Sequence, residues 1–198
     1  MKNALRNMLP FVDGSFGRRF LSDRSAIAAM EFALTLPVLT ALWLGMAELT
    51  QISIASAKTT QAAQSVADLV GRYSASGYTD PKGFSDLEAA ATTIIAPLAT
   101  TAGNPLVAVV SATINNSGTP TQAWSCSTGT MPASYSAATL LKAAPALTTS
   151  NSALGSIVMV TVSYSYTPTI SGGITGTQIF SATAYSTPRI VSAIPKPC

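Results

Sequence analysis

One long apolar segment constrains the fold of this chain more than any other feature. Residues 25–47 lie between Arg24 and Glu48 and contain a single formal charge, that of Glu31. As a helix, these 23 residues extend over about 34 Å at about 1.5 Å per residue, and the hydrocarbon core of a bilayer is about 30 Å thick. The segment therefore predicts one membrane-spanning helix; a buried helix of a soluble protein is the alternative.

The charges beside this segment predict its orientation. The net charge is +3, residues 1–25 carry five basic and two acidic residues, and residues 26–198 carry six of each sign. Basic residues favour the cytoplasmic side, so we expect a cytoplasmic leader over 1–26 and an exterior location after about residue 50. A cleaved secretory signal is the alternative, because Ala55-Ser56-Ala57 is an A-x-A site beyond the apolar run. Nucleic-acid binding is not expected, because the folded part carries no basic excess.

The helical period continues past the span with one apolar face, which predicts a single helix over 27–73 and a headgroup over 74–198. The expected apolar seam, at alternating steps of three and four, consists of Ile52, Ala55, Thr59, Ala62, Val66, Leu69 and Tyr73.

The headgroup sequence combines a short helix with strands. A capping box of Ser85 and Glu88 predicts a helix that starts at Ser85 and stops before Pro97. Val, Ile, Thr and Tyr then alternate with period two, and we expect strands over 106–114, 122–128, 157–166 and 177–185. One face of the third strand should pack on the helix and the other should meet water or a neighbouring subunit. The predicted fold class is α+β, a long N-terminal transmembrane helix continuing into a small antiparallel-sheet headgroup.

Catalytic patterns are missing. The sequence has no histidine, which removes Ser-His and Cys-His pairs and the commonest metal ligand. Its two cysteines are far apart, whereas a zinc site needs clustered ligands, and no Gly-rich loop precedes a Lys-Ser or Lys-Thr pair. We therefore expect no enzyme activity, no cofactor and no metal site.

Cys126 and Cys198 are the only cysteines, and both fall on the predicted outer side, where disulfides persist. A disulfide would close a loop of about 70 residues, worth roughly 4 kcal/mol in the chain-entropy model. Two separate thiols are the alternative. We favour the disulfide, because a free terminal cysteine outside the cell has no packing reason to exist.

Glu31 is a functional candidate, because a charge at the centre of a bilayer costs roughly 2.5 to 3.5 kcal/mol. It lies near the cytoplasmic end of the span, so snorkelling to the interface is the structural alternative. The functional interpretation requires a cation. A cut after Ala26 would give Ile27 a free amine, which could pair with Glu31 of an adjacent subunit.

The run RSAIAAMEFALTLP at 24–37, followed by LGMAEL at 44–49, resembles the N-terminal signature of the TadE-like family. These proteins are pseudopilins of the tight-adherence (Flp pilus) machinery, and the resemblance covers about residues 18–50. It implies a pilin-like architecture and cleavage by a prepilin peptidase between Ala26 and Ile27, with Glu31 fifth in the mature chain. The residue before the cut is usually glycine in these families, and alanine stands there in this chain.

The resemblance also implies a role and partners. The expected protein is a minor pseudopilin-like subunit that acts in pilus assembly and adhesion. Its partners would be other pseudopilins or pilins, a prepilin peptidase and an inner-membrane assembly platform. It would cross the bacterial inner membrane once, with a periplasmic C-terminal domain, or be incorporated in the pilus. The alternative is an uncleaved membrane-anchored extracytoplasmic binding or adhesion module.

Overall fold

The structure is a computed structural model, and the chain divides into two compact units, Met1–Ala47 and Glu48–Cys198. Most of the predicted leader, residues 1–23, lies outside the described residues. The described residues are 24–73, 82–98, 100–101, 103–114, 120–130, 137–143, 155–170, 172–190, 192–196 and 198.

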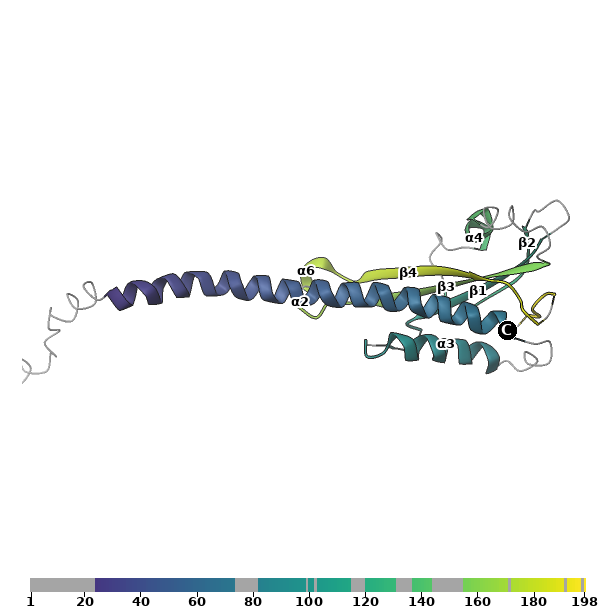
Figure 1. The fold of residues 1–198 in the computed structure, drawn as a ribbon, viewed down its shortest axis with the longest axis horizontal. Coiled ribbons are helices and arrows are strands. Elements are labelled where there is room, and N and C mark those ends of the chain that lie inside the picture. Colours follow the sequence, from purple (N-terminus) through teal and green to yellow (C-terminus); the bar gives the residue numbers. More distant parts are fainter. Residues whose placement is uncertain are drawn as a thin grey trace, which may run out of the picture. The chain divides into compact units, whose positions relative to one another are not determined.

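The long N-terminal helix is confirmed. Helix α2 runs over Arg24–Gly71 without interruption, with Pro37 inside it (Figure 1). It is long and apolar enough to cross a membrane, with a mean hydropathy of 1.8. Large apolar side chains of the first unit, such as Leu34 and Trp43, are each 71% exposed. An apolar surface of this extent is unusual in a soluble monomer and fits a lipid environment.

The headgroup contains one sheet of four antiparallel strands in the order β2-β1-β3-β4. The four predicted strands are confirmed to within two residues at each end, because runs of Val, Ile, Thr and Tyr suit a pleated surface. The strands are β1 (Leu106–Ile114), β2 (Pro120–Ser127), β3 (Ser156–Tyr166) and β4 (Gln178–Ser186). The headgroup helices are α3 (Lys82–Ile95), α4 (Ala137–Ala143) and α6 (Gly172–Thr175).

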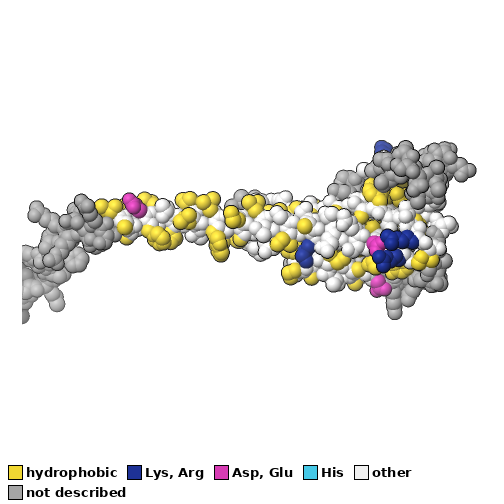
Figure 2. All heavy atoms as spheres, in the orientation of Figure 1, with side chains coloured by type: hydrophobic (Ala, Val, Ile, Leu, Met, Phe, Trp, Pro, Cys, Tyr) yellow, Lys and Arg dark blue, Asp and Glu magenta, His cyan; other side chains and the backbone are white. Residues whose placement is uncertain are grey.

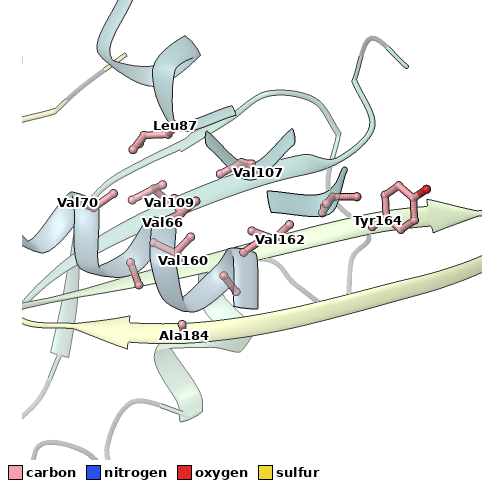
Figure 3. Close-up of a cluster of buried hydrophobic side chains, with 14 of the residues drawn as sticks. Val66, Val70, Leu87, Val107, Val109, Val160, Val162, Tyr164 and Ala184 are labelled. Atoms are coloured by element: carbon pink, nitrogen blue, oxygen red, sulfur yellow. The ribbon is translucent and has the colours of Figure 1, made fainter. Parts of the chain in front are cut away.

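The main core lies between one face of this sheet and helices α2 and α3 (Figure 3). Strand β3 contributes alternate residues, among them Val160 and Val162, both fully buried. Helix α2 contributes alanines and valines such as Ala62 and Val66, which are also fully buried. Because alanine is short, the helix backbone can approach the sheet closely. The predicted packing of one β3 face on the helix is confirmed.

The predicted seam of α2 is correct at its start and wrong at Leu69. Ala55, Thr59 and Ala62 are fully buried or nearly so, whereas Leu69 is 42% exposed and Val70 is buried in its place. Alternating steps of three and four assume 3.5 residues per turn, and a straight helix with 3.6 drifts by about 20° per heptad. Two heptads after Ala55, the buried face has therefore moved to the next residue.

The second face of the sheet is also partly covered. Val110, Ile157 and Met159 are at most 3% exposed and pack with Leu141 of α4 in a smaller core. The prediction that this face meets water or a neighbouring subunit is wrong where α4 lies, because the prediction did not include a helix that covers this face. Serine and threonine hydroxyls pair across β3 and β4 further along, as between Thr161 and Thr183 at 3.0 Å.

Helix α3 begins at Lys82, so the prediction that Ser85 caps its start is wrong. Apolar residues at steps of four, Leu87, Ala91 and Ile95, face the core as expected for one face of a helix. Phe84, which precedes the capping signal, also packs against the core, so the helix includes residues on both sides of Ser85. Lys58 of α2 donates to the carbonyl oxygens of Ile94, at 3.0 Å, and Ala96. A cation there satisfies the C-terminal carbonyls of α3 and complements its dipole.

Gly71, the last residue of α2, provides a test of this packing. A Cβ added there would overlap the Ser186 hydroxyl and lie 3.1 Å from the carbonyl oxygen of Thr187. A glycine-to-alanine change inside an exposed helix stabilises it by about 1 kcal/mol, but overpacking costs about 1 to 3 kcal/mol. We expect Gly71→Ala to lower the free energy of unfolding of the headgroup.

The matched control is Gly45→Ala, because nothing lies within 4 Å of a Cβ added there. Urea unfolding in detergent micelles would be followed by Trp124 fluorescence, with Trp43 replaced by Phe in every variant. Equal midpoints for the two alanine variants would contradict the close packing at Gly71.

Candidate functional site

The Ala26–Ile27 bond lies two residues after the described start of α2 at Arg24. Ile27 is 60% exposed. The bond lies within the described part of the helix in this structure.

Glu31 follows Ile27 by four residues, about one helical turn, on an exposed part of the apolar segment. The ion pairs among the described residues both involve Asp68, and neither includes Glu31. Among the described residues, no Lys or Arg side chain forms an ion pair with Glu31.

Glu48, at the other end of the segment, has an unexpected contact. Its carboxylate oxygen Oε1 accepts a hydrogen bond from the backbone N–H of Ile170 at 3.1 Å, and the residue is only 8% exposed. Ile170 belongs to the connection between β3 and β4, which includes α6 and lies beside α2 (Figure 1). Sequence reasoning missed this contact. The available signal was a lone acid where the helix changes from wholly apolar to one-faced.

The C-terminal segment is fastened to the sheet by a disulfide between Cys126 of β2 and Cys198, with Cα atoms 6.1 Å apart. Two hydrogen bonds support the same attachment. The indole N–H of Trp124 donates to the carbonyl oxygen of Ile194 at 2.8 Å, and the Ser156 hydroxyl donates to that of Ser192 at 2.9 Å. The chain end is therefore part of the headgroup body.

A charged cluster marks the end of α2 near Gly71. Asp68 pairs with Arg72 at 2.6 Å and with Arg189 at 2.8 Å, and the Arg189 N–H donates to the Gly71 carbonyl oxygen at 2.9 Å. Figure 2 shows how sparse charged side chains are elsewhere on the visible described surface. These side chains are substantially exposed, so each pair contributes at most about 1 kcal/mol.

A pocket of about 510 Å³ opens on the headgroup. Its lining consists of Gln51, Pro97, Leu98, Thr101, Asn104, Tyr164, Ser165, Tyr166, Thr167 and Thr169, and none of these residues is charged. Burial, followed by the nearby Tyr166, raises the pKa of the Tyr164 phenol above its usual 10.0, so this wall of the pocket is neutral at physiological pH. The Asn104 side chain is engaged by both N–H and C=O of Ser165. The lining thus offers hydroxyl and amide groups but no charged side chain.

The described residues contain no group of three His, Cys, Asp or Glu side chains that could hold a metal ion.

In comparison with known proteins, one family model matches part of the chain. Residues 26–68 match the model of the TadE-like proteins, which confirms the resemblance seen in the sequence. The match begins one residue before Ile27 and extends through the helix into its buried face. No curated protein and no solved structure matches the chain.

The disulfide gives a direct prediction. Alkylation of the denatured protein without reductant should leave its mass unchanged, and alkylation after reduction should label two thiols. Reduction should lower the free energy of unfolding of the headgroup by about 4 kcal/mol. The double variant Cys126→Ser/Cys198→Ser is the control, because reductant should not change its stability. Labelling of the unreduced protein would contradict the bond.

Proposed function

The chain carries the TadE-like match over residues 26–68, and from this premise we propose that it is a minor pseudopilin-like subunit of a tight-adherence pilus or secretion system. The observation that carries the proposal is this match, which includes both the candidate cleavage bond and Glu31. The uninterrupted helix from Arg24 to Gly71 supports it, because a subunit of such an assembly needs one helix that serves as anchor and as packing element.

In this proposal the chain crosses the inner membrane once, with the leader in the cytoplasm and the headgroup in the periplasm. The basic excess before the span supports the orientation, and the disulfide supports an oxidising compartment for the headgroup. A prepilin peptidase cuts between Ala26 and Ile27. The processed chain then associates with pilins or pseudopilins through an inner-membrane assembly platform.

Glu31 gives this association a register. The amine that the cut creates at Ile27 of one subunit pairs with Glu31 of its neighbour, which neutralises two charges that are costly in lipid. The two residues are four positions apart, so adjacent helices are offset by about 6 Å at about 1.5 Å per residue. A buried ionic contact of this kind serves to fix register more than to add stability.

The first prediction from this proposal concerns processing. In a host that contains the prepilin peptidase, purified protein should begin at Ile27, as N-terminal sequencing and intact mass would report. Ala26→Gly should be cut faster, because a smaller residue suits a constricted protease site, and Ala26→Leu should remain uncut. A chain that still begins at Met1 in the Ala26→Gly variant would refute the proposed cleavage.

The second prediction concerns assembly. Glu31→Ala and Glu31→Gln should reduce co-purifying pilus subunits to background, because both remove the charge that pairs with the amine. Glu31→Asp should retain part of the association. Glu88→Ala, which removes an acid from α3 of the headgroup, is the control and should assemble normally. An intact disulfide in each variant would show that the headgroup has folded. Normal assembly of Glu31→Gln would count against the ion pair.

A second candidate function is an uncleaved, membrane-anchored adhesion module. The observation that favours it is Ala26 in the place of the usual glycine, at a bond that is helical in this chain. Its signature would be a wild-type chain that keeps Met1, an Ala26→Gly variant that is cut, and unchanged behaviour of Glu31→Ala.

A further inference from the structure

Ile170, in the connection between β3 and β4, is held against α2 at one defined level. The hydrogen bond from the Ile170 N–H to Glu48 fixes that level. Glu48 is the first charged residue after Glu31 along α2. In a membrane-anchored chain it therefore marks the place where the helix leaves the hydrocarbon and enters the headgroup layer of the lipids.

Large apolar side chains are exposed at this level, while the Glu48 side chain is buried. Leu49, next to Glu48, is 65% exposed, and Ile170 is 54% exposed. No formal charge occurs between Lys142 and Arg189 in the sequence, so the whole β3–β4 connection is neutral. Its polar groups are hydroxyls and backbone amides, which suit the interfacial layer of a bilayer.

The opposite end of the headgroup differs in charge. The cluster of Asp68, Arg72 and Arg189 lies near Gly71, 23 residues further along α2 than Glu48. At about 1.5 Å per residue the two levels are about 34 Å apart on the helix. The level of Glu48 is therefore the one that adjoins the apolar segment in the sequence.

We propose that the outer-leaflet surface of the bilayer binds the β3–β4 connection, with the Ile170 side chain inserted at the boundary of headgroups and acyl chains. This inference rests on the membrane anchoring in the proposed function and is independent of cleavage and pilus assembly. Glu48 accepts the Ile170 N–H and so satisfies a backbone donor where water is scarce. The contact holds the headgroup against the membrane at two points, the helix and the loop.

Lipid is the occupant that the observations favour over a second protein. The exposed apolar residues at this level, Leu49 and Ile170, are few, whereas a stable protein interface buries about 800 Å² on each partner. This level also adjoins the span in sequence through Leu49. The anchor therefore brings it to the bilayer surface whether or not another subunit is present.

Site-directed spin labelling of the full chain would test this contact. Cysteine would replace Ile170, Ile190 or Leu39 one at a time, and the native cysteines would remain in their disulfide, so each variant accepts one label. Ile190 is the matched control, because it is 63% exposed and adjoins Arg189 at the charged end. Leu39, 59% exposed within the apolar segment, reports the anchor itself. The vesicles would contain phosphatidylcholine and phosphatidylglycerol.

Collision with oxygen, which concentrates in lipid, and with a water-soluble nickel chelate would be measured for each label. We expect the oxygen-to-nickel ratio at position 170 to be several-fold above that at position 190 and below that at position 39. Equal ratios at 170 and 190 would overturn the proposal. Low collision with both reagents at 170 would also overturn it and indicate a protein contact, such as a second copy. A water-like ratio at 39 would refute the membrane anchor, and the loop contact with it.

Discussion

The rest of this structure depends on the packing of the alanine-rich face of α2 against the valine face of the sheet. Ala62 and Val66 on the helix meet Val160 and Val162 on β3, and all four are fully buried. Small helix residues allow close approach, and β-branched residues on a central strand present a stiff surface. This contact makes one helix both the apolar segment of the first unit and a layer of the headgroup core.

Secondary attachments extend this packing to the ends of the headgroup. Lys58 donates a hydrogen bond to the carbonyl oxygen of Ile94 at the end of α3. Glu48 accepts one from Ile170 in the β3–β4 connection, and Asp68 forms an ion pair with Arg189 after β4. The charged or acidic residues of α2 that are described in the headgroup thus each have a partner outside α2. The chain has few charged residues, and these three lie where helices and strands meet. The surface away from these contacts consists mostly of hydroxyl and methyl groups, which suits contact with lipid or with other subunits.

Much of the fold could be predicted from the sequence because its local signals are strong and agree with one another. The period changes from helical to alternating near residue 106, and the strands follow to within two residues. The resemblance around Ala26, Ile27 and Glu31 agrees with the family match over residues 26–68, because its signature lies within one continuous segment. The predictions failed where tertiary packing or helix geometry overrode a local sequence signal. At Leu69 the helix geometry shifted the buried face, and at Ser85 the helix α3 had already begun.

The sequence by itself determined the apolar segment with its single glutamate, the long helix and the alternating strands. These properties depend on residues that are neighbours in the chain. Only the tertiary structure decided the strand order, the α4 cover of the second face, the bond between Glu48 and Ile170, and the approach of Arg189 to Asp68. The last two contacts join residues 122 and 121 positions apart. No periodic signal spans such separations, because they are set by how the sheet folds back on the helix.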